Sequence, residues 1–320
     1  MGAATVAAIL TLAVLALGWG TYPVAPDAVI RALLGSGTAL DTTVVVGWRL
    51  PRVLAAVALG ALLAIAGALF QTVTRNPLAS PDILGLSNGA FTGMLITLVL
   101  VSSSWPARAA GALVGCLAAS LLIWLLAYRG GIQGFRLIVV GIGVSAMLAS
   151  LNTWMLLQVE LETAMFASAW GHGSLNGVTG DALGGVLLCA LPVALAAFAL
   201  GPSLRQLELG DDLATATGVR PHLVRSVALL IGVVLVAAAT AIAGPIAFVA
   251  LAAPQIARRL ARSPSLSLTL SGLVGALVLL VSDAIAQHVL PVALPVGVVT
   301  VSVGGAYLIV MIVSEIRRRA

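Results

Sequence analysis

The sequence contains no lysine and has few histidines, cysteines and charged residues. Charged residues make up 8% of the 320 residues, and arginine supplies all sixteen basic side chains. Because a Walker A loop needs a lysine, the chain cannot by itself be a conventional P-loop ATPase. The three histidines are scattered, which disfavours a metal site, and the sequence has no Ser–His–Asp or His-Glu-x-x-His arrangement typical of an intramembrane enzyme. Cys116 and Cys189 both lie within apolar runs, so we expect two buried thiols and no disulfide.

Apolar residues dominate what remains. They make up 61% of the chain, and the mean hydropathy is +1.15. No soluble globular domain has this composition, and no polar stretch is long enough to form one, so residues 1–320 are predicted to be a single transmembrane domain. At roughly 20 residues per crossing, the apolar runs predict an all-α polytopic membrane protein with about ten transmembrane helices, near 3–20, 51–71, 87–104, 107–127, 136–157, 182–201, 224–243, 246–261, 267–287 and 295–314.

The arginines favour one orientation of these spans. With both termini inside, the outer segments hold only Arg31, Arg49, Arg52 and Arg108. The inner segments hold Arg75, Arg129, Arg136, Arg205, Arg220, Arg225, Arg258, Arg259, Arg262, Arg317, Arg318 and Arg319. The positive-inside rule therefore predicts a multi-pass protein with cytoplasmic termini. Anionic lipid accounts for the net charge of +5, and no nucleic-acid partner is needed.

Residues 203–226 form the longest polar connection, and this orientation makes it cytoplasmic. Asp211 and Asp212 are expected to cap a short helix that runs through Thr217. Gly218 is a plausible stop, and Pro221 prevents its continuation. The connection is either a handle that another protein grips or an ordinary solvated loop.

Three further features could carry function. Arg49 and Arg52 begin the second span on the outside, where they either dock an acidic partner or anchor the helix in the lipid headgroups. The two prolines after Asn76 predict a rigid turn. If the turn also has a function, it would form a constriction beside a pore. Asp283 is the clearest intramembrane carboxylate, placed near the outer end where water could reach it. It would either carry protons or serve structural pairing and hydration.

Several motifs, in order from about residue 45 to the C-terminus, resemble the FecCD family of permeases. They are Arg49-Leu50-Pro51-Arg52, Ala66-Gly67-Ala68, Arg75 to Gly85 (RNPLASPDILG), Gly210-Asp211-Asp212, Thr217-Gly218-Val219, Ala243-Gly244-Pro245-Ile246 and Leu294 to Thr300 (LPVGVVT). The segments around 135–143, 152–164 and 173–177 are similar to the ferric-enterobactin permeases of that family. The family consists of permease subunits of bacterial ATP-binding-cassette importers for ferric siderophores, haem and vitamin B12.

The resemblance implies a type II importer permease with ten helices and an inverted repeat. Ala64 to Gly67 (AIAG) recurs at Ala241 to Gly244 in spans of opposite direction, which fits such a repeat weakly. It also implies a location in the bacterial inner membrane. The implied partners are a second permease subunit, two cytoplasmic ATPases that bind the ATP, and a periplasmic or lipid-anchored binding protein. A paralogous second permease is favoured over a second copy.

Residue roles follow from the same resemblance. Arg49 and Arg52 match arginines that receive glutamates of the binding protein, and Asn76 and Leu78 match a cytoplasmic gate. A third family arginine is Gln287 here. The residues matching the ATPase-coupling helices are Leu207, Glu208, Gly210, Asp211, Asp212, Ala216, Gly218 and Val219.

The expected function is therefore ATP-driven import of a ferric siderophore, with a catecholate type favoured, by a subunit that performs no chemistry and binds no cofactor. A vitamin B12 or haem permease would share the fold. A proton-driven transporter would need Asp283 as its carrier and no ATPase. A metal-ion permease would be expected to show more histidine and acidic residues along the path.

Overall fold

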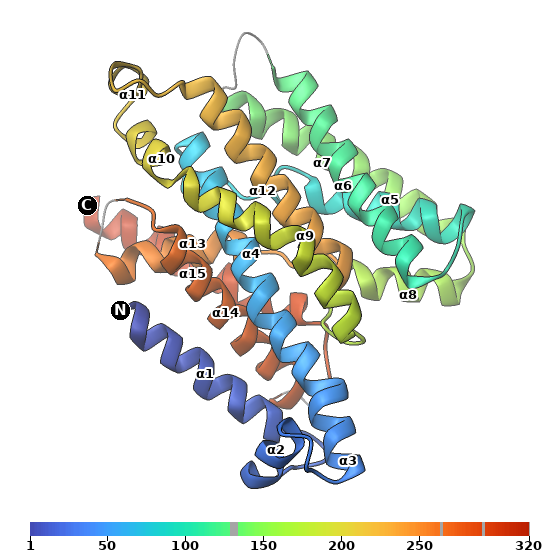
Figure 1. Ribbon diagram of the computed structural model, residues 1–320. Coiled ribbons are helices and arrows are strands. Elements are labelled where there is room, and N and C mark those ends of the chain that lie inside the picture. Colours follow the sequence, from blue (N-terminus) through green and yellow to red (C-terminus); the bar gives the residue numbers. More distant parts are fainter. Residues whose placement is uncertain (129–133, 263–264, 290–291, 320) are drawn as a thin grey trace.

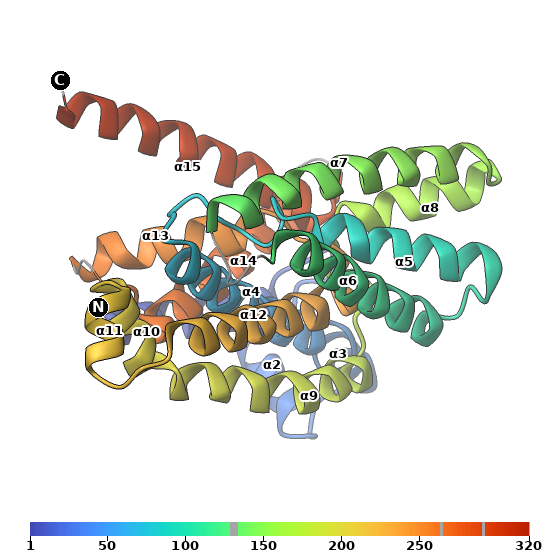
Figure 2. The same cartoon turned by 90° about the horizontal axis from the view of Figure 1, so that it is seen from above.

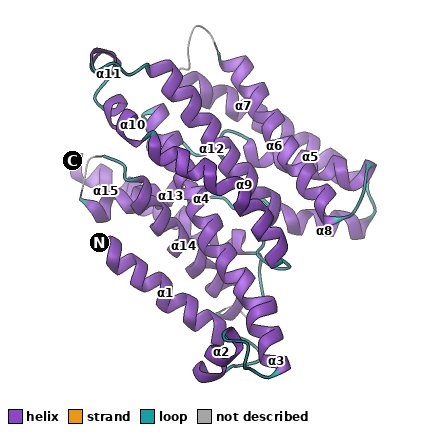
Figure 3. Cartoon of the chain, viewed as in Figure 1, coloured by secondary structure: helices purple, strands orange, loops and turns teal. Residues whose placement is uncertain are grey.

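The computed structural model describes residues 1–128, 134–262, 265–289 and 292–319. Throughout these residues the regular elements are helices, and the described ranges contain no strand (Figures 1 and 3). The prediction of an all-helical protein is confirmed. Arg129, one of the arginines assigned to the inner side, lies outside the described residues.

Helix α4 (Leu50–Thr74) is the centre of the bundle, and it packs against α12 (Pro221–Ala243), α13 (Val249–Ala261) and α14 (Leu268–His288). In both α4 and α12, 78% of the most apolar stretch is buried within the protein. Glycines allow this close approach: a Cβ on Gly67 would overlap the carbonyl oxygen of Ala250, and one on Gly60 would overlap the backbone of Gly275. Small residues therefore fix the spacing of the central helices.

Helices α6 (Trp105–Ala127), α7 (Gly134–Leu157) and α9 (Gly180–Ala199) lie at the periphery (Figure 2). Only 22%, 17% and 22% of their most apolar stretches are buried. Their outward faces carry exposed leucines, which suit contact with lipid acyl chains. Cys189, expected to be buried, is exposed on α9, whereas Cys116 on α6 is buried. The prediction for Cys189 was wrong because α9 presents this side chain to the outside of the bundle.

Each predicted span coincides with a helix. Six helical stretches are long and apolar enough to cross a membrane: the continuous stretch 39–74, α6, α7, α9, α12 and α14. Shorter apolar helices are α1 (Gly2–Gly18), α5 (Leu86–Leu100) and the part of α15 (Val296–Arg319) up to Met311. Helix α13 has 13 residues and contains Pro254. The count of about ten crossings therefore stays a prediction.

The second span starts earlier than predicted. Helix α3 (Ala39–Thr42) continues through the π-helical segment η1 (Thr43–Arg49) into α4. Pro51 has no N–H to donate to the carbonyl four residues before it, and this gap in the hydrogen-bond ladder explains the wider winding just upstream. The arginines expected at the helix start therefore lie inside a continuous helix.

Three additional helices occupy segments that were expected to be connections. They are α2 (Pro26–Leu33), α8 (Leu161–Gly171) and α10 (Gly201–Glu208). The stretch 203–226 is therefore mostly helical, because α10, the short α11 (Asp211–Ala216) and the start of α12 fill it.

The two termini lie at the same end of the bundle as α10 and α11, at the left in Figures 1 and 2. Helices α2, α3 and α8 lie toward the other end. This arrangement agrees with the arginine pattern, in which the termini share a side with the 203–226 connection. Which end faces the cytoplasm stays a prediction.

Candidate functional site

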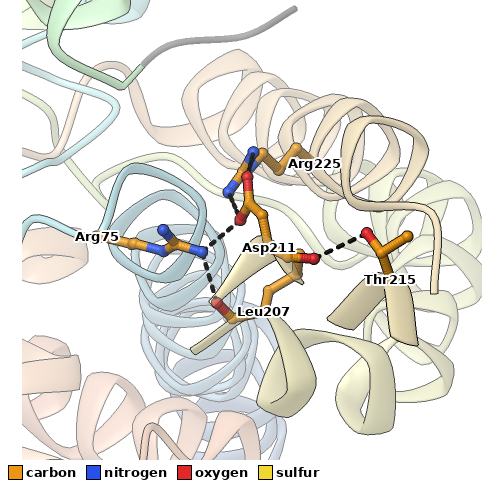
Figure 4. Close-up of polar contacts among 5 residues, drawn as sticks. All are labelled: Arg75, Leu207, Asp211, Thr215 and Arg225. Carbon is orange, nitrogen blue, oxygen red and sulfur yellow. Dashed lines mark hydrogen bonds and ion pairs between the residues drawn. The ribbon is translucent and has the colours of Figure 1, made fainter. Parts of the chain in front are cut away.

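A single carboxylate, that of Asp211, joins three helices at the end of the bundle that carries the termini. Arg225, near the start of α12, donates from Nη1 to Oδ2 at 2.9 Å and from Nη2 to Oδ1 at 2.5 Å. Arg75, directly after α4, donates from Nη2 to the same Oδ1 at 2.5 Å and to the carbonyl of Leu207 at 2.9 Å. Figure 4 shows both guanidinium groups pointing at Asp211 from different helices. The start of α11 is thereby tied to the ends of α4, α10 and α12.

The expected role of Asp211 and Asp212 as helix caps was wrong. Gly210, with φ of +120°, is the residue that precedes α11, and no side chain caps the helix. The carboxylate of Asp211 bonds instead to the two arginines, because bidentate bonds to a guanidinium are stronger than a bond to one backbone N–H. The short helix itself is confirmed, and Gly218, with φ of +84°, follows its end as predicted.

The two arginines keep Asp211 ionised. Hydrogen bonding to Arg225, with the nearby charges of Arg225 and Arg75, lowers the pKa of Asp211 below its ordinary 3.8. One carboxylate faces two guanidinium groups, so the cluster carries one net positive charge. Arg225 is nearly buried, with a side chain 10% exposed, whereas Asp211 and Arg75 are about half exposed. Among the described residues, Arg75 and Arg225 have no ion-pair partner other than Asp211.

Arg75 has an unusual backbone for a residue with a side chain. Its φ of +52° is left-handed, and the N–H groups of Arg75 and Asn76 return to the carbonyls of Thr72 and Gln71. This is a Schellman motif, in which glycine is the usual residue at the left-handed position. A left-handed non-glycine residue persists where its surroundings hold it. Here the bonds to Asp211 and Leu207 supply that hold.

Helices α10 and α11 form a compact pair whose outer surface exposes two leucines among polar side chains. Thr217 donates to the amide oxygen of Gln206 at 2.8 Å, which fastens the end of α11 to α10. Leu209 and Leu213 are 70% and 57% exposed, respectively. Of the eight residues predicted for this element, Leu207 is buried, Gly210, Asp211 and Val219 are half-buried, and Glu208, Asp212, Ala216 and Gly218 are exposed.

The predicted gate residues directly follow Arg75. The side-chain oxygen of Asn76 accepts the N–H of Leu78 at 2.9 Å, and its carbonyl accepts the N–H of Ala79 at 3.1 Å. These bonds close a rigid turn, as the prolines predict. The Leu78 side chain is 41% exposed. The turn therefore leaves an apolar side chain exposed, three residues after Arg75.

Arg52 and Asp283 form a second cluster, toward the other end of α4. Nε and Nη2 of Arg52 donate to the two carboxylate oxygens at 2.8 and 2.7 Å, and Nη1 donates to the side-chain oxygen of Asn176 at 2.6 Å. The Asp283 side chain is only 9% exposed, so little of it is open to water. The bidentate pair shields the carboxylate and favours structural pairing over a free proton carrier.

Arg49 lies near this cluster but has different partners. It donates to the carbonyl of Leu17 at 2.8 Å and to that of Tyr22 at 2.6 Å, at the end of α1 and just beyond it. Both arginines predicted for docking therefore have partners within the chain. Gln287, which stands where the family has a third arginine, has a buried side-chain nitrogen with no hydrogen-bond partner.

Sequence reasoning missed Arg225, Arg75 and Asn176 as members of these clusters. Arg75 and Asp211 are 136 positions apart, and Arg52 and Asp283 are 231 apart. Arg225 follows Asp211 by 14 positions, with two helix ends between them. No local pattern connects such residues. Among the described residues, His, Cys, Asp and Glu side chains form no group of three that could hold a metal.

Residues 8–314 match the FecCD transport family. The chain is 47% identical to the ferric enterobactin transport system permease protein FepG of Escherichia coli K12, over 98% of this chain and 96% of that one. It is 36% identical to the corresponding protein FepD of the same organism, over 92% and 89%. It is 35% identical to the achromobactin permease protein CbrC of Dickeya dadantii, over 98% and 92%.

A solved structure has a similar fold. It is a metal-chelate type ABC transporter in an inward-facing conformation, which superposes with a TM-score of 0.86 at 24% identity and covers 98% of both chains.

Proposed function

The chain belongs to the FecCD transport family, and we propose that it is the permease subunit of an ATP-binding-cassette importer that carries a ferric siderophore across the cytoplasmic membrane. The observation that carries this proposal is the 47% identity to a ferric enterobactin permease over 98% of the chain. The names of FepG and FepD both favour a catecholate siderophore as the substrate class. The chain itself performs no chemistry and needs no cofactor.

The whole chain acts as one transmembrane domain of ten crossings with an inverted repeat, and both termini lie in the cytoplasm. Two ATPase subunits bind and hydrolyse ATP, and a periplasmic or lipid-anchored protein delivers the siderophore. A paralogous permease is the favoured second subunit. The observation behind this choice is that the chain resembles two different permease proteins that bear the name of one transport system.

Residues 207–219 form the coupling element, and the ATPase contacts it through exposed side chains rather than through the carboxylate of Asp211, which is bonded to Arg75 and Arg225. The exposed Leu209 and Leu213 at the end of the bundle supply the apolar surface that such a contact needs. Closure of the ATPases on ATP would move α10 and α11 as a body and switch the permease between outward-open and inward-open states. Asn76 and Leu78 form the gate on the same side.

Arg49 and Arg52 receive acidic groups of the binding protein at the opposite end. Arg52 keeps two N–H groups that no bond among the described residues uses, because three of its five donate to Asp283 and Asn176. Docking would engage these remaining donors. The pair with Asp283 would orient the guanidinium for that contact.

Uptake into proteoliposomes tests the function. The permease, a candidate paralogue, the ATPase and the binding protein are reconstituted together, with ATP inside and radiolabelled ferric enterobactin outside. We expect ATP-dependent uptake that an unlabelled ferric catecholate competes and that cyanocobalamin and haem do not. Competition by cyanocobalamin or haem alone would assign the other substrate class of the family.

The ATPase contact has its own test. Leu213→Asp places a charge in the proposed contact and should reduce copurification of the ATPase with the permease. Leu34→Asp is the matched control, because Leu34 is 77% exposed at the end of α2, near the other end of the bundle. Equal copurification with both variants would exclude this face of α11 as the contact.

A further inference from the structure

The gate turn is held in place by a side chain that also belongs to the α10–α11 pair. Arg75 is the residue between α4 and Asn76, so its position determines where the turn begins. Its guanidinium is fixed at two points, the carboxylate of Asp211 and the carbonyl of Leu207. A movement of α10 or α11 would therefore displace Arg75, the residue that precedes the gate turn.

The same carboxylate extends this connection to α12. Arg225 grips both oxygens of Asp211, and its side chain is nearly buried in the first turns of a helix that packs along α4. Helix α11 has six residues and is joined to the rest of the chain by short connections. Asp211 is its charged attachment to the membrane helices, and Figure 4 shows the two arginines meeting there.

We infer that Asp211 is a positioning residue that transmits movement of the α10–α11 pair to the gate turn through Arg75 and to the bundle through Arg225. The inference rests on the proposed function, since it takes α10 and α11 as the ATPase contact. It differs from a role in ATPase binding, because both carboxylate oxygens of Asp211 are bonded to arginines of this chain, whereas the exposed Leu209 and Leu213 have apolar side chains free for a contact. Removal of the carboxylate should therefore leave the ATPase bound and break the connection from the α10–α11 pair to Arg75 and Arg225.

The central variant is Asp211→Asn, which keeps the side chain's size and removes its charge. The assembled transporter is reconstituted in proteoliposomes, and three quantities are measured: copurified ATPase, ATP hydrolysed, and ferric siderophore taken up. We expect assembly and hydrolysis within about twofold of the unmodified transporter. Uptake per ATP should fall by about fivefold or more, the lower range for coupling between distant sites.

Arg75→Gly is the second variant, and it keeps the inference testable if Asp211→Asn fails to fold. Glycine suits the left-handed backbone at this position, so the helix end stays favourable while the guanidinium is lost. It should show the same fall in uptake per ATP. Asp27→Asn is the matched control, because Asp27 pairs with Arg31 at 2.7 Å on the surface of α2, away from this cluster. It should leave all three quantities unchanged.

Unchanged uptake per ATP in both Asp211→Asn and Arg75→Gly would overturn the inference. So would a loss of ATPase from the complex in parallel with the loss of uptake, since that result would make the cluster a binding surface or a purely structural support. Failure of the unmodified transporter to show any ATP-dependent uptake is a separate result, and it would refute the proposed function on which the inference rests.

Discussion

The pair between Arg52 and Asp283 allows the most detailed prediction. Asp283→Asn would leave a mostly buried guanidinium without its counter-ion, and Arg52→Met would leave a carboxylate that is 9% exposed without its partner. Breaking a buried ion pair costs about 3–5 kcal/mol. Because Arg52 is 21% exposed, solvent screens the pair and we expect a cost below that range, about 2–3 kcal/mol for each single variant.

The assay is thermal unfolding of the purified permease in detergent, followed by intrinsic fluorescence. At about 2 °C per kcal/mol for a long chain, each single variant should unfold roughly 5 °C lower. The double variant Arg52→Met/Asp283→Asn leaves neither charge without a partner, so it should be at least as stable as the less stable of the two single variants. Asp27→Asn, in the exposed pair with Arg31, is the control and should shift the midpoint by less than about 1 °C. Additive losses in the double variant would show that the two residues do not act as a pair and would refute the reasoning.

Three further predictions concern other parts of the bundle. Gly67→Ala should cost about 1–3 kcal/mol, because its Cβ would overlap a backbone carbonyl of α13; the same change at Gly184, where nothing lies within 4 Å, should leave the unfolding midpoint equal or higher. Gln71→Leu should cost about 1–3 kcal/mol, since it strands the buried amide of Gln255 that bonds to it, and adding Gln255→Leu should restore part of the loss in the same unfolding assay. Because the pKa of Asp211 is lowered, its bonds contribute stability above the unfolded-state pKa and lose it only as the pH falls through the lower folded-state value. Uptake per ATP should therefore be equal at pH 6 and pH 8 as far as this group is concerned, and a fall at pH 6 that Asp211→Asn abolishes would contradict the assignment.

Composition and periodicity were sufficient for the class of fold, because twenty-residue apolar runs have few structural outcomes in a membrane. The residues of α4 and α12 show this directly, since their long runs coincide with the two most buried of the six long apolar helices. The early start of the helix before Pro51 could not be predicted. Because proline has no N–H, the winding of the preceding turn depends on which carbonyls the neighbouring N–H groups bond to, and the sequence does not show this. Helix α8 was missed for a different reason: its eleven residues are too short to be read as a span, and the segment looked like a connection.

The candidate sites were predicted in part. The short helix that begins at Asp211 and ends before Gly218 was predicted correctly, since turn chemistry is local, but the residue that precedes it is Gly210 and no carboxylate caps it. The partners of Asp211 were not, because its bonds to Arg75 and Arg225 form only when three helix ends are packed together. The same is true of Asp283, whose partner Arg52 lies 231 positions away. A charged residue in an apolar chain indicates that it has a polar partner, but only the packing of the helices shows which residue that partner is.

The energy source of uptake tests the central claim most directly. Proteoliposomes that contain the permease, its paralogue and the ATPase, with the binding protein outside, are supplied in turn with internal ATP and with an inward proton gradient. We predict uptake of ferric siderophore with ATP, none with the gradient alone, and no uptake when the ATPase is omitted. Uptake driven by the gradient without ATPase would contradict the account and would identify Asp283 as the residue to examine.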